Sequence, residues 1–169
     1  FDDHVYDANT KGRKTPTHLI MDAWIKGLRS LTVAYEYWVQ PDAAREILRA
    51  AEITGIAVRI GLEFQVPFYG RFVSVFWIPR GFSSHEDFLE FLHSPKVAEM
   101  MKRGREVLRW RRDRVLHCLA LWNEHQRPKM EAAWGVEIPE LSADECLRFV
   151  GRGQASSLHL AEGLHRHVQ

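Results

Sequence analysis

Residues 57–64 read Ala-Val-Arg-Ile-Gly-Leu-Glu-Phe, a short apolar run rich in β-branched side chains. Residues 31–35, Leu-Thr-Val-Ala-Tyr, and residues 72–78, Phe-Val-Ser-Val-Phe-Trp-Ile, have the same character. Short runs of this composition, bounded by turn residues, are typical of β-strands. The sequence therefore predicts three strands here, and residues 1–6 are a candidate fourth.

Helical patterns fill the gaps between the first strands. Pro16 stands at a first-turn position, and the helical pattern after it ends at Gly27. A second helical pattern begins near Pro41 and ends at Gly55. Strands that alternate with helices across short loops are typical of parallel strands joined by right-handed crossovers. The expected fold class is therefore α/β, either an open doubly wound sheet or a β/α barrel with parallel strands.

After Pro79 the pattern becomes helical. Helix starts are predicted at residues that cap or open a first turn, namely Ser84, Pro95, Ser142 and Ser156 or Ser157. The α/β part over residues 1–80 and the helical part over residues 81–169 can be two domains, but no linker rich in Pro, Gly and Ser separates them. We expect one domain over residues 1–169, with the helical part as an insertion in a barrel.

Composition excludes several classes of protein. With 46% hydrophobic residues, 27% charged residues and a net charge of +1, the 169-residue chain resembles ordinary globular proteins. The apolar stretch of residues 24–39 is interrupted by Lys26, Arg29 and Glu36, so it falls short of the roughly 18 apolar residues that a membrane span needs. Motifs such as GxxxxGK[ST], GxSxG and HExxH, which mark nucleotide sites and common hydrolases, are absent from the sequence.

The cysteines indicate the cellular compartment of the protein, and the basic residues bear on its partners. Cys118 and Cys146 fall inside helical patterns and lack the spacing of a zinc site. We interpret them as reduced core thiols of an intracellular protein and expect a cytoplasmic location. The basic run of residues 102–114 has few interleaved aromatic residues, so we expect a solvated helix face and no nucleic-acid partner.

The predicted strand ends carry short motifs. Residues 1–7 read Phe-Asp-Asp-His-Val-Tyr-Asp, and residues 61–63 read Gly-Leu-Glu. The first stretch resembles an acidic residue followed by His-x-His, and the second resembles Gly-x-Glu, two motifs of the PHP (polymerase and histidinol phosphatase) superfamily. His4 matches the first histidine, and Glu63 matches a glutamate that bridges metal ions in that family. Tyr6 stands at the second histidine.

The resemblance extends along the chain. Residues 23–33 resemble the next helix and strand of the family, residues 111–123 its arginine-rich helix, and residues 157–161 its His-x-Ala helix. Glu36 and Ser74 stand where the family has histidines. The later strands of the family have no counterpart in the sequence. The resemblance therefore implies the N-terminal part of a PHP-like domain, an incomplete TIM-like β/α barrel cut from a longer chain, with degenerate metal motifs.

Metal-dependent hydrolysis of a phosphoester needs several His and carboxylate ligands that converge. By the resemblance, the candidate metal ligands are His4, Glu63, Glu36 and Asp2, and Asp7 is a further oxygen donor. This oxygen-rich set suits Mn or Mg better than Zn. A closed site usually needs three or four protein ligands. Because only two matched positions keep a ligand, we expect a chain without bound metal.

Aromatic and polar side chains near the strand ends are candidates for a ligand pocket. They are Tyr6, Tyr35, Tyr37, Arg59, Arg71 and Ser74. A structural alternative remains, in which Arg59 or Arg71 holds Glu63 as an ion-paired carboxylate and His4 is a polar residue on a loosely held first strand.

Two functions follow from these observations. The resemblance implies a domain related to metal-dependent phosphoesterases, which is catalytically weak or inactive because its metal motifs are degenerate. An active chain would be a metal-dependent hydrolase. The alternative is a non-catalytic binding or scaffold domain for a small anionic ligand, such as a phosphorylated molecule, or for a protein partner. The expected protein partner is the rest of the parent chain or a second copy, because a truncated barrel leaves strand edges unpaired.

Overall fold

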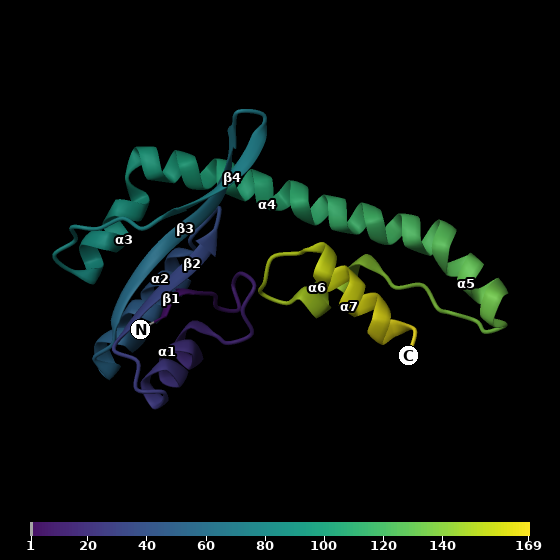
Figure 1. Cartoon of the computed structure of the whole chain (residues 1–169), viewed down its shortest axis with the longest axis horizontal. Helices are drawn as coiled ribbons and strands as arrows, with labels where there is room; N and C mark the ends of the chain where they lie inside the picture. Colours follow the sequence, from purple (N-terminus) through teal and green to yellow (C-terminus); the bar gives the residue numbers. More distant parts are fainter. Residues whose placement is uncertain (1) are drawn as a thin grey trace. The chain divides into compact units, whose positions relative to one another are not determined.

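The computed structural model describes residues 2–169 and contains one four-stranded sheet with helices (Figure 1). The strands are β1 (Asp2–Val5), β2 (Ser30–Glu36), β3 (Ala57–Phe68) and β4 (Arg71–Trp77), and they lie in the sheet in this order. The sheet curls as a half-barrel. Of the candidate first strand, residues 1–6, the structure forms β1 over Asp2–Val5; Tyr6 follows the strand, and Phe1 lies outside the described residues.

The sheet is mixed and not parallel throughout. β1, β2 and β3 are parallel neighbours, as predicted, but β4 runs antiparallel to β3. The prediction of a parallel strand at residues 72–78 is therefore wrong. A parallel crossover needs about a dozen residues or more, whereas Phe68 pairs with Arg71 and only Tyr69 and Gly70 connect them. Both connecting residues have positive φ, 45° and 74°, as a tight two-residue hairpin turn requires.

The first helices begin and end where the sequence predicts. α1 (Pro16–Ile25) follows Thr15, whose hydroxyl accepts a hydrogen bond from the His18 N–H. α2 (Pro41–Thr54) ends at Gly55, which has a left-handed φ of 72°. The later helical segments are α3 (His85–His93), α4 (Pro95–Leu121), the π-helical turn η1 (Trp122–Gln126), α5 (Arg127–Trp134), α6 (Ala143–Val150) and α7 (Ser157–His167).

The chain divides into two compact units, residues 1–106 and 107–169, and the boundary falls inside α4. The sequence predicts that the α/β part ends near residue 80. In the structure, α3 and the first turns of α4 pack on the α/β core through Phe88, Leu92, Val97 and Met101. The first unit therefore includes helices that the sequence assigns to the helical part.

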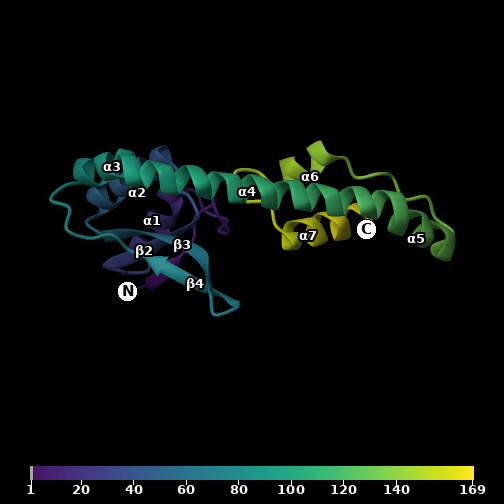
Figure 2. The same cartoon turned by 90° about the horizontal axis from the view of Figure 1, so that it is seen from above.

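The core of the first unit lies between its helices and one face of the sheet (Figure 2). Alternate side chains of β2 and β3 are buried there with side chains of α1 and α2, namely Leu31, Val33, Tyr35, Ile60, Leu62, Ile20, Ala23, Ala44, Ile47 and Leu48. Because side chains alternate across a strand, the intervening residues of β2 and β3 point to the opposite face.

The second unit has its own small core, formed by Val115, Leu119, Leu141, Cys146 and Leu160. Cys146 is buried there, but Cys118 is exposed, so the prediction of a core thiol is wrong for Cys118. Along residues 2–169, no helix combines the length and the apolar character that crossing a membrane requires.

Candidate functional site

The candidate site lies on the face of the sheet opposite the core. The parallel register of β2 and β3 places Glu36 beside Glu63 and Ala34 beside Gly61. Side chains of register partners project to the same face of a sheet. On β4, Phe76 is the register partner of Glu63. Residues of three neighbouring strands, β2, β3 and β4, therefore contribute to one surface.

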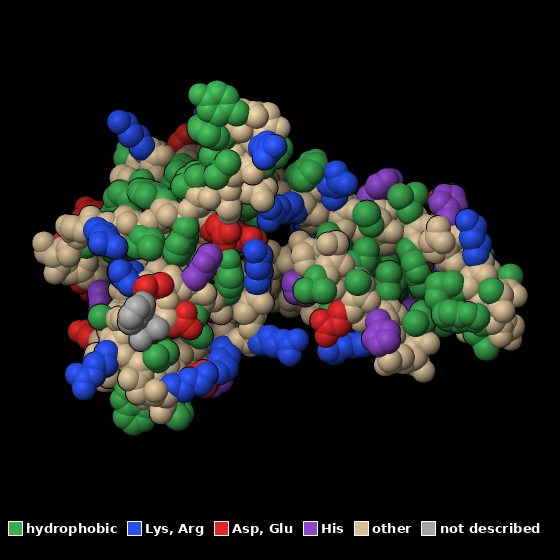
Figure 3. All heavy atoms as spheres, in the orientation of Figure 1, with side chains coloured by type: hydrophobic (Ala, Val, Ile, Leu, Met, Phe, Trp, Pro, Cys, Tyr) green, Lys and Arg blue, Asp and Glu red, His purple; other side chains and the backbone are tan. Residues whose placement is uncertain are grey.

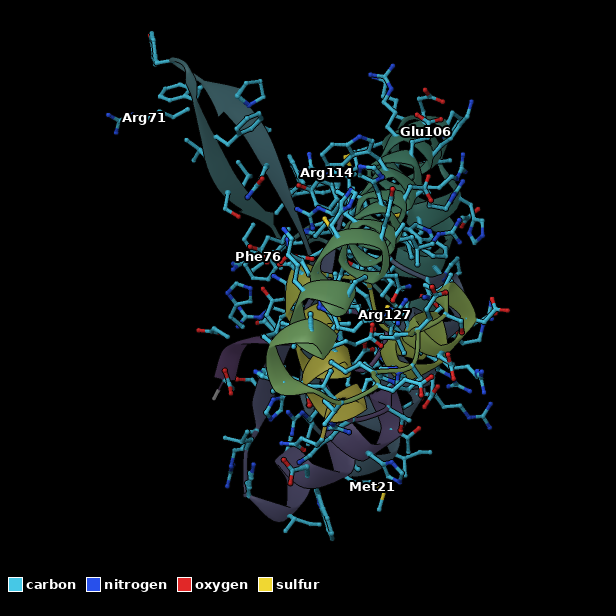
Figure 4. All side chains as sticks on the ribbon, turned by 90° about the vertical axis from the view of Figure 1, so that its right-hand side faces the viewer. Met21, Arg71, Phe76, Glu106, Arg114 and Arg127 are labelled. Carbon is cyan, nitrogen blue, oxygen red and sulfur yellow. The ribbon has the colours of Figure 1, made fainter. Side chains whose placement is uncertain are left out.

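Phe76 lies against Gly61 on this face. A Cβ atom added to Gly61 would overlap the Phe76 ring, so glycine is needed for the ring to approach the strand. The His4 imidazole stacks on Phe76, with ring centroids 4.6 Å apart and an angle of 9° between the planes. Figure 4 shows Phe76 near the base of the β3–β4 hairpin. Gly61 thus leaves room for the Phe76 ring on which the His4 imidazole stacks.

Glu63 is the centre of a hydrogen-bonded cluster. The Tyr6 hydroxyl donates to Glu63 Oε2 at 2.5 Å, and the Ser74 hydroxyl donates to Glu63 Oε1 at 2.9 Å. His4 Nε2 lies 3.0 Å from the Tyr6 hydroxyl oxygen and 3.5 Å from Glu63 Oε2. The structure therefore brings together four side chains, His4, Tyr6, Glu63 and Ser74, which stand at the positions that the resemblance matches to metal ligands.

These contacts determine the protonation of the cluster. Burial raises the pKa of the Tyr6 hydroxyl well above its ordinary value, as do the hydrogen bond to Glu63 and the charges of Glu63 and Glu36, so Tyr6 remains a donor. Partial burial opposes ionisation of Glu63. The hydrogen bonds from Tyr6 and Ser74 and the charge of Lys11 nevertheless outweigh burial and lower the pKa of Glu63. At neutral pH Glu63 is a carboxylate with a hydrogen bond on each oxygen.

Lys11 brings a positive charge to the neighbouring carboxylate. Its ammonium nitrogen lies 2.5 Å from Glu36 Oε1, and Glu36 is only 7% exposed. The same nitrogen lies 5.1 Å from the centroid of the Tyr6 ring, within the range of a cation–π contact. The charge of Lys11 also acts on Glu63, the register partner of Glu36, and helps to lower its pKa.

The loop between β1 and α1 positions Lys11. The Asp7 carbonyl oxygen accepts hydrogen bonds from the N–H groups of Thr10 and Gly12. A Cβ atom on Gly12 would overlap the Tyr6 carbonyl group, so the loop closes on Tyr6 only with glycine at this position. Lys11 precedes this glycine in the loop, and its side chain, which is 51% exposed, reaches over the Tyr6 ring.

Asp7 and Tyr35 form a buried pair that anchors this loop to β2. The Tyr35 hydroxyl donates to Asp7 Oδ2 at 2.6 Å, and both residues are 0% exposed. Burial, together with the Asp7 charge, raises the pKa of Tyr35 far above its ordinary value, so Tyr35 remains protonated. Tyr35, predicted as a pocket residue, lies in the core beside Val33. Asp7 is held as a hydrogen-bond acceptor inside the fold.

The two predicted arginines lie elsewhere. Arg59 donates to Asp3 Oδ1 at 2.6 Å. Arg71 is the register partner of Phe68 at the tip of the hairpin, and Figure 4 shows it projecting away from the sheet. The alternative in which Arg59 or Arg71 holds Glu63 therefore fails, because Arg59 pairs with Asp3, Arg71 lies at the tip of the hairpin, and the hydrogen bonds that Glu63 accepts come from Tyr6 and Ser74.

Asp2 and Tyr37 lie at the margins of the site. Asp2 is exposed, and its Oδ1 atom is 3.4 Å from the His4 N–H nitrogen. Tyr37 follows β2 with φ 59°, and its N–H donates to the Glu63 carbonyl oxygen at 2.8 Å. Tyr37 thus extends the pairing of β2 with β3 through its backbone.

The side chains present do not fit a metal cluster. Within residues 2–169, no group of three or more His, Cys, Asp or Glu side chains is arranged to hold a metal ion. Both oxygens of Glu63 accept hydrogen bonds from hydroxyl groups, and an ammonium group contacts Glu36. A metal ion at this surface would compete with three donors of the protein itself.

Sequence reasoning missed Lys11 and Phe76. Lys11 carries a weak signal, since a lysine before a glycine in a loop is usually solvated. Phe76 has a stronger one, because a glycine inside a strand pattern, as at Gly61, often marks the close approach of a bulky group.

The chain shares its fold with solved structures of hydrolases. No protein-family model and no curated protein sequence matches it. The structure superposes on a protein from Bifidobacterium adolescentis described as a "putative metal-dependent phosphoesterase", with a TM-score of 0.68 and 18% identity. It also superposes on an amidohydrolase from Chromobacterium violaceum, solved with bound sulfate and no metal, with a TM-score of 0.59 and 19% identity.

Both alignments cover 98% of this chain, but only 50% and 49% of the other chains. This chain therefore spans about half the length of either protein. At these sequence identities, the likeness establishes a shared fold.

Proposed function

We propose that this chain is a PHP-like domain in which a hydrogen-bonded network replaces the metal centre, and that it acts as a non-catalytic binding or scaffold domain. The observation that supports this most strongly is the bonding of Glu63. Tyr6 and Ser74, which stand at histidine positions of the family, donate to both of its carboxylate oxygens. A protonated hydroxyl group is a much poorer metal ligand than a neutral imidazole nitrogen, and here both hydroxyl groups donate to Glu63.

The fold supports the relation to metal-dependent hydrolases. One structural neighbour is described as a phosphoesterase of this kind, and a second is an amidohydrolase. The PHP assignment itself rests on the order of the motifs around His4, Gly61 and Glu63, and on their meeting at one face of the sheet.

The chemistry of the cluster supports the non-catalytic part of the proposal. Hydrolysis at a metal centre needs ions that activate water and neutralise charge on the phosphoryl oxygens. The side chains at the positions that the family uses for this purpose here form hydrogen bonds with one another. Glu63 is also a weak general base, because its pKa is lowered and both of its oxygens accept hydrogen bonds.

The β3–β4 hairpin is the surface that we propose for a protein partner, either the rest of the parent chain or a second copy. Apolar side chains gather at its tip (Figure 3), with exposed fractions of 58% for Phe68, 92% for Tyr69 and 76% for Phe72. β4 is also an edge strand, whose outer N–H and C=O groups can pair with another strand.

Metal analysis of two proteins of equal length tests the proposal. The purified wild-type chain is expected to contain less than about a tenth of an equivalent of any transition metal, and to hydrolyse no phosphate ester after Mn²⁺ addition. The triple variant Tyr6→His, Glu36→His, Ser74→His is expected to bind Mn²⁺ or Zn²⁺, because three imidazoles then join His4 and Glu63. Stoichiometric metal in the wild-type chain, with Mn²⁺-dependent phosphatase activity, would contradict the proposal.

A further inference from the structure

We propose that a second copy of this chain binds along the outer edge of β4, so that the two β4 strands pair antiparallel about Ser74 and join two sheets into one. In this dimer Phe72 of the second copy lies beside Phe76, next to the candidate site. The inference rests on the proposed function, in which the β3–β4 hairpin binds a protein partner, and it names that partner.

The two edges of the sheet differ in how well they are protected. β1 forms one edge with only four residues, its register with β2 shifts between Asp2 and Val5, and Asp2 and Asp3 are charged. β4 forms the other edge, contains no proline, and has Arg71 as its only charged residue. Short, irregular and charged strands resist pairing with another chain, whereas a regular apolar strand favours it. β4 is therefore the edge that is open to a partner.

Alternate residues of β4 direct their backbone groups to this edge. Residues that flank a two-residue turn exchange hydrogen bonds, and the pattern alternates from there along an antiparallel pair. Phe72, Ser74 and Phe76 therefore turn their N–H and C=O groups away from β3. Pro67, which has no N–H, is the register partner of Phe72, in agreement with this alternation. Within residues 2–169, no backbone–backbone hydrogen bond outside the β3–β4 pairing involves β4.

Symmetry then selects one register. A second copy related by a two-fold axis pairs antiparallel, and residues with outward-pointing backbone groups must face one another. When the axis passes through Ser74, Phe72 faces Phe76 of the second copy, and the pairing includes the whole of Arg71–Trp77. Any other two-fold register pairs fewer residues of the strand. The pairing centred on Ser74 therefore satisfies the most backbone groups.

On the face of the candidate site, this register brings aromatic rings together. Phe72 is 76% exposed and faces Phe76 of the second copy. The ring of Phe76 also stacks with the His4 imidazole. Aromatic residues that are directly opposite on one face of an antiparallel pair stabilise the pairing. Phe72 of the second copy therefore covers the outer side of Phe76 and shields the candidate site from that side.

On the opposite face, the strand also complements itself. Val73 is 43% exposed and faces Val75 of the second copy, and Arg71 faces Trp77. An arginine beside a tryptophan ring can make a cation–π contact. Because Arg71 is the only charged side chain of β4, no two like charges meet between the paired strands. One surface patch that fits itself is what a symmetric dimer requires.

Analytical ultracentrifugation measures the association of the wild-type chain. One pair of strands buries less than the roughly 1,600 Å² of a standard interface, so we expect a dissociation constant on the order of 10 µM. Val73→Lys places a charge opposite Val75 and is expected to raise the dissociation constant by about tenfold or more. Val136→Lys is the control, because Val136 is also exposed, at 52%, but lies outside the hairpin. The control should change the dissociation constant by less than about twofold.

Disulfide cross-linking tests the register. Val73→Cys and Val75→Cys are made separately in a Cys118→Ser background, because Cys118 is exposed. Opposite residues of a pair without hydrogen bonds have Cα atoms about 4.5 Å apart, within the range of a disulfide. Oxidation of a mixture of the two variants is expected to link position 73 to position 75. Each variant alone should link poorly, because diagonal neighbours lie about 7–8 Å apart.

A wild-type chain that stays monomeric up to about 500 µM, well above such a dissociation constant, overturns the inference. A dimer that Val73→Lys leaves intact also overturns it, because the copies then bind through another surface. If Val73→Lys does not fold, Phe72→Ala is measured in the same way, and an unchanged dissociation constant has the same meaning. Cross-links from 73 to 73 that are as efficient as those from 73 to 75 contradict the register.

Metal analysis keeps this inference distinguishable from the proposed function. A metal-free monomer overturns the pairing of β4 and leaves the hydrogen-bonded cluster around Glu63 standing. Stoichiometric metal in a chain that dimerises through β4 contradicts the cluster and not the pairing.

Discussion

Replacement of Glu63 by glutamine distinguishes a structural carboxylate from an empty metal ligand. Glu63 accepts hydrogen bonds from Tyr6 and Ser74, and its side chain is 18% exposed. Hydrogen bonds to charged groups contribute about 1.5–3 kcal/mol each. Glutamine keeps one carbonyl oxygen as acceptor but turns an NH₂ group toward the other hydroxyl, which must rotate to accept. We therefore expect Glu63→Gln to lower the free energy of unfolding by about 2 kcal/mol.

Thermal unfolding measures this change directly. A loss of this size corresponds to a melting temperature roughly 4–8 °C lower for a chain of this length. Glu90→Gln is the control, because Glu90 is exposed on α3 and its replacement should cost less than about 0.5 kcal/mol. If Glu63 were instead an unoccupied metal ligand, its replacement by glutamine would remove a negative charge and relieve repulsion with Glu36. An unchanged or raised melting temperature for Glu63→Gln would therefore refute the account of the cluster.

The pH dependence provides a second test of the same variant. The pKa of Glu63 is lowered in the folded chain, so its contribution to stability is fully present above the ordinary glutamate value of 4.5. That contribution is lost as the pH falls through the folded-state pKa, where the carboxylate becomes protonated. The difference in unfolding free energy between wild type and Glu63→Gln should be constant near neutral pH and shrink below pH 4.5. A difference that grows on acidification would contradict the assigned protonation.

Three further substitutions test the packing of Phe76 on Gly61, the hydrogen bond between Tyr35 and Asp7, and the association of the β3–β4 hairpin. Gly61→Ala should destabilise the chain by about 1–3 kcal/mol in urea unfolding, because its methyl group overlaps the Phe76 ring, and Phe76→Leu should restore part of the loss. Tyr35→Phe should cost about 1–3 kcal/mol in the same assay, since it removes a donor from the buried Asp7 carboxylate; a neutral result would mean that water replaces the hydroxyl. The wild-type chain should associate, as a symmetric dimer, in light scattering, and Phe72→Ser should weaken the association; a clean monomer at high concentration would show that the hairpin binds no second copy.

Much of the α/β architecture is visible in the sequence because local chemistry determines it. Thr15 and Gly55 place the ends of two helices through capping and left-handed backbone geometry. The direction of β4 could not be predicted in this way. Gln65–Gly70 contains a proline and a turn-forming Tyr-Gly pair, which indicates a loop as readily as a hairpin. Only the pairing of Phe68 with Arg71 distinguishes the two.

The sequence predicts the residues of the candidate site that lie on strands, but it does not predict those that lie in loops. His4, Glu36 and Glu63 can be found because parallel strand ends meet at one edge of a sheet. Lys11 escapes such reasoning, since its role depends on how a loop closes around Asp7 and Gly12. The sequence predicts Tyr35 at the pocket because it lies near the end of a predicted strand. Side chains alternate along β2, so Tyr35 faces the core and Glu36 faces the site.

The most direct test of the central claim is a crystal structure of the wild-type chain grown with excess Mn²⁺, with anomalous scattering measured at the manganese edge. The account predicts no anomalous peak near Glu36 and Glu63, the ammonium of Lys11 against Glu36, and the hydroxyl groups of Tyr6 and Ser74 on Glu63. A manganese peak between Glu36 and Glu63, with Lys11 displaced into solvent, would contradict it.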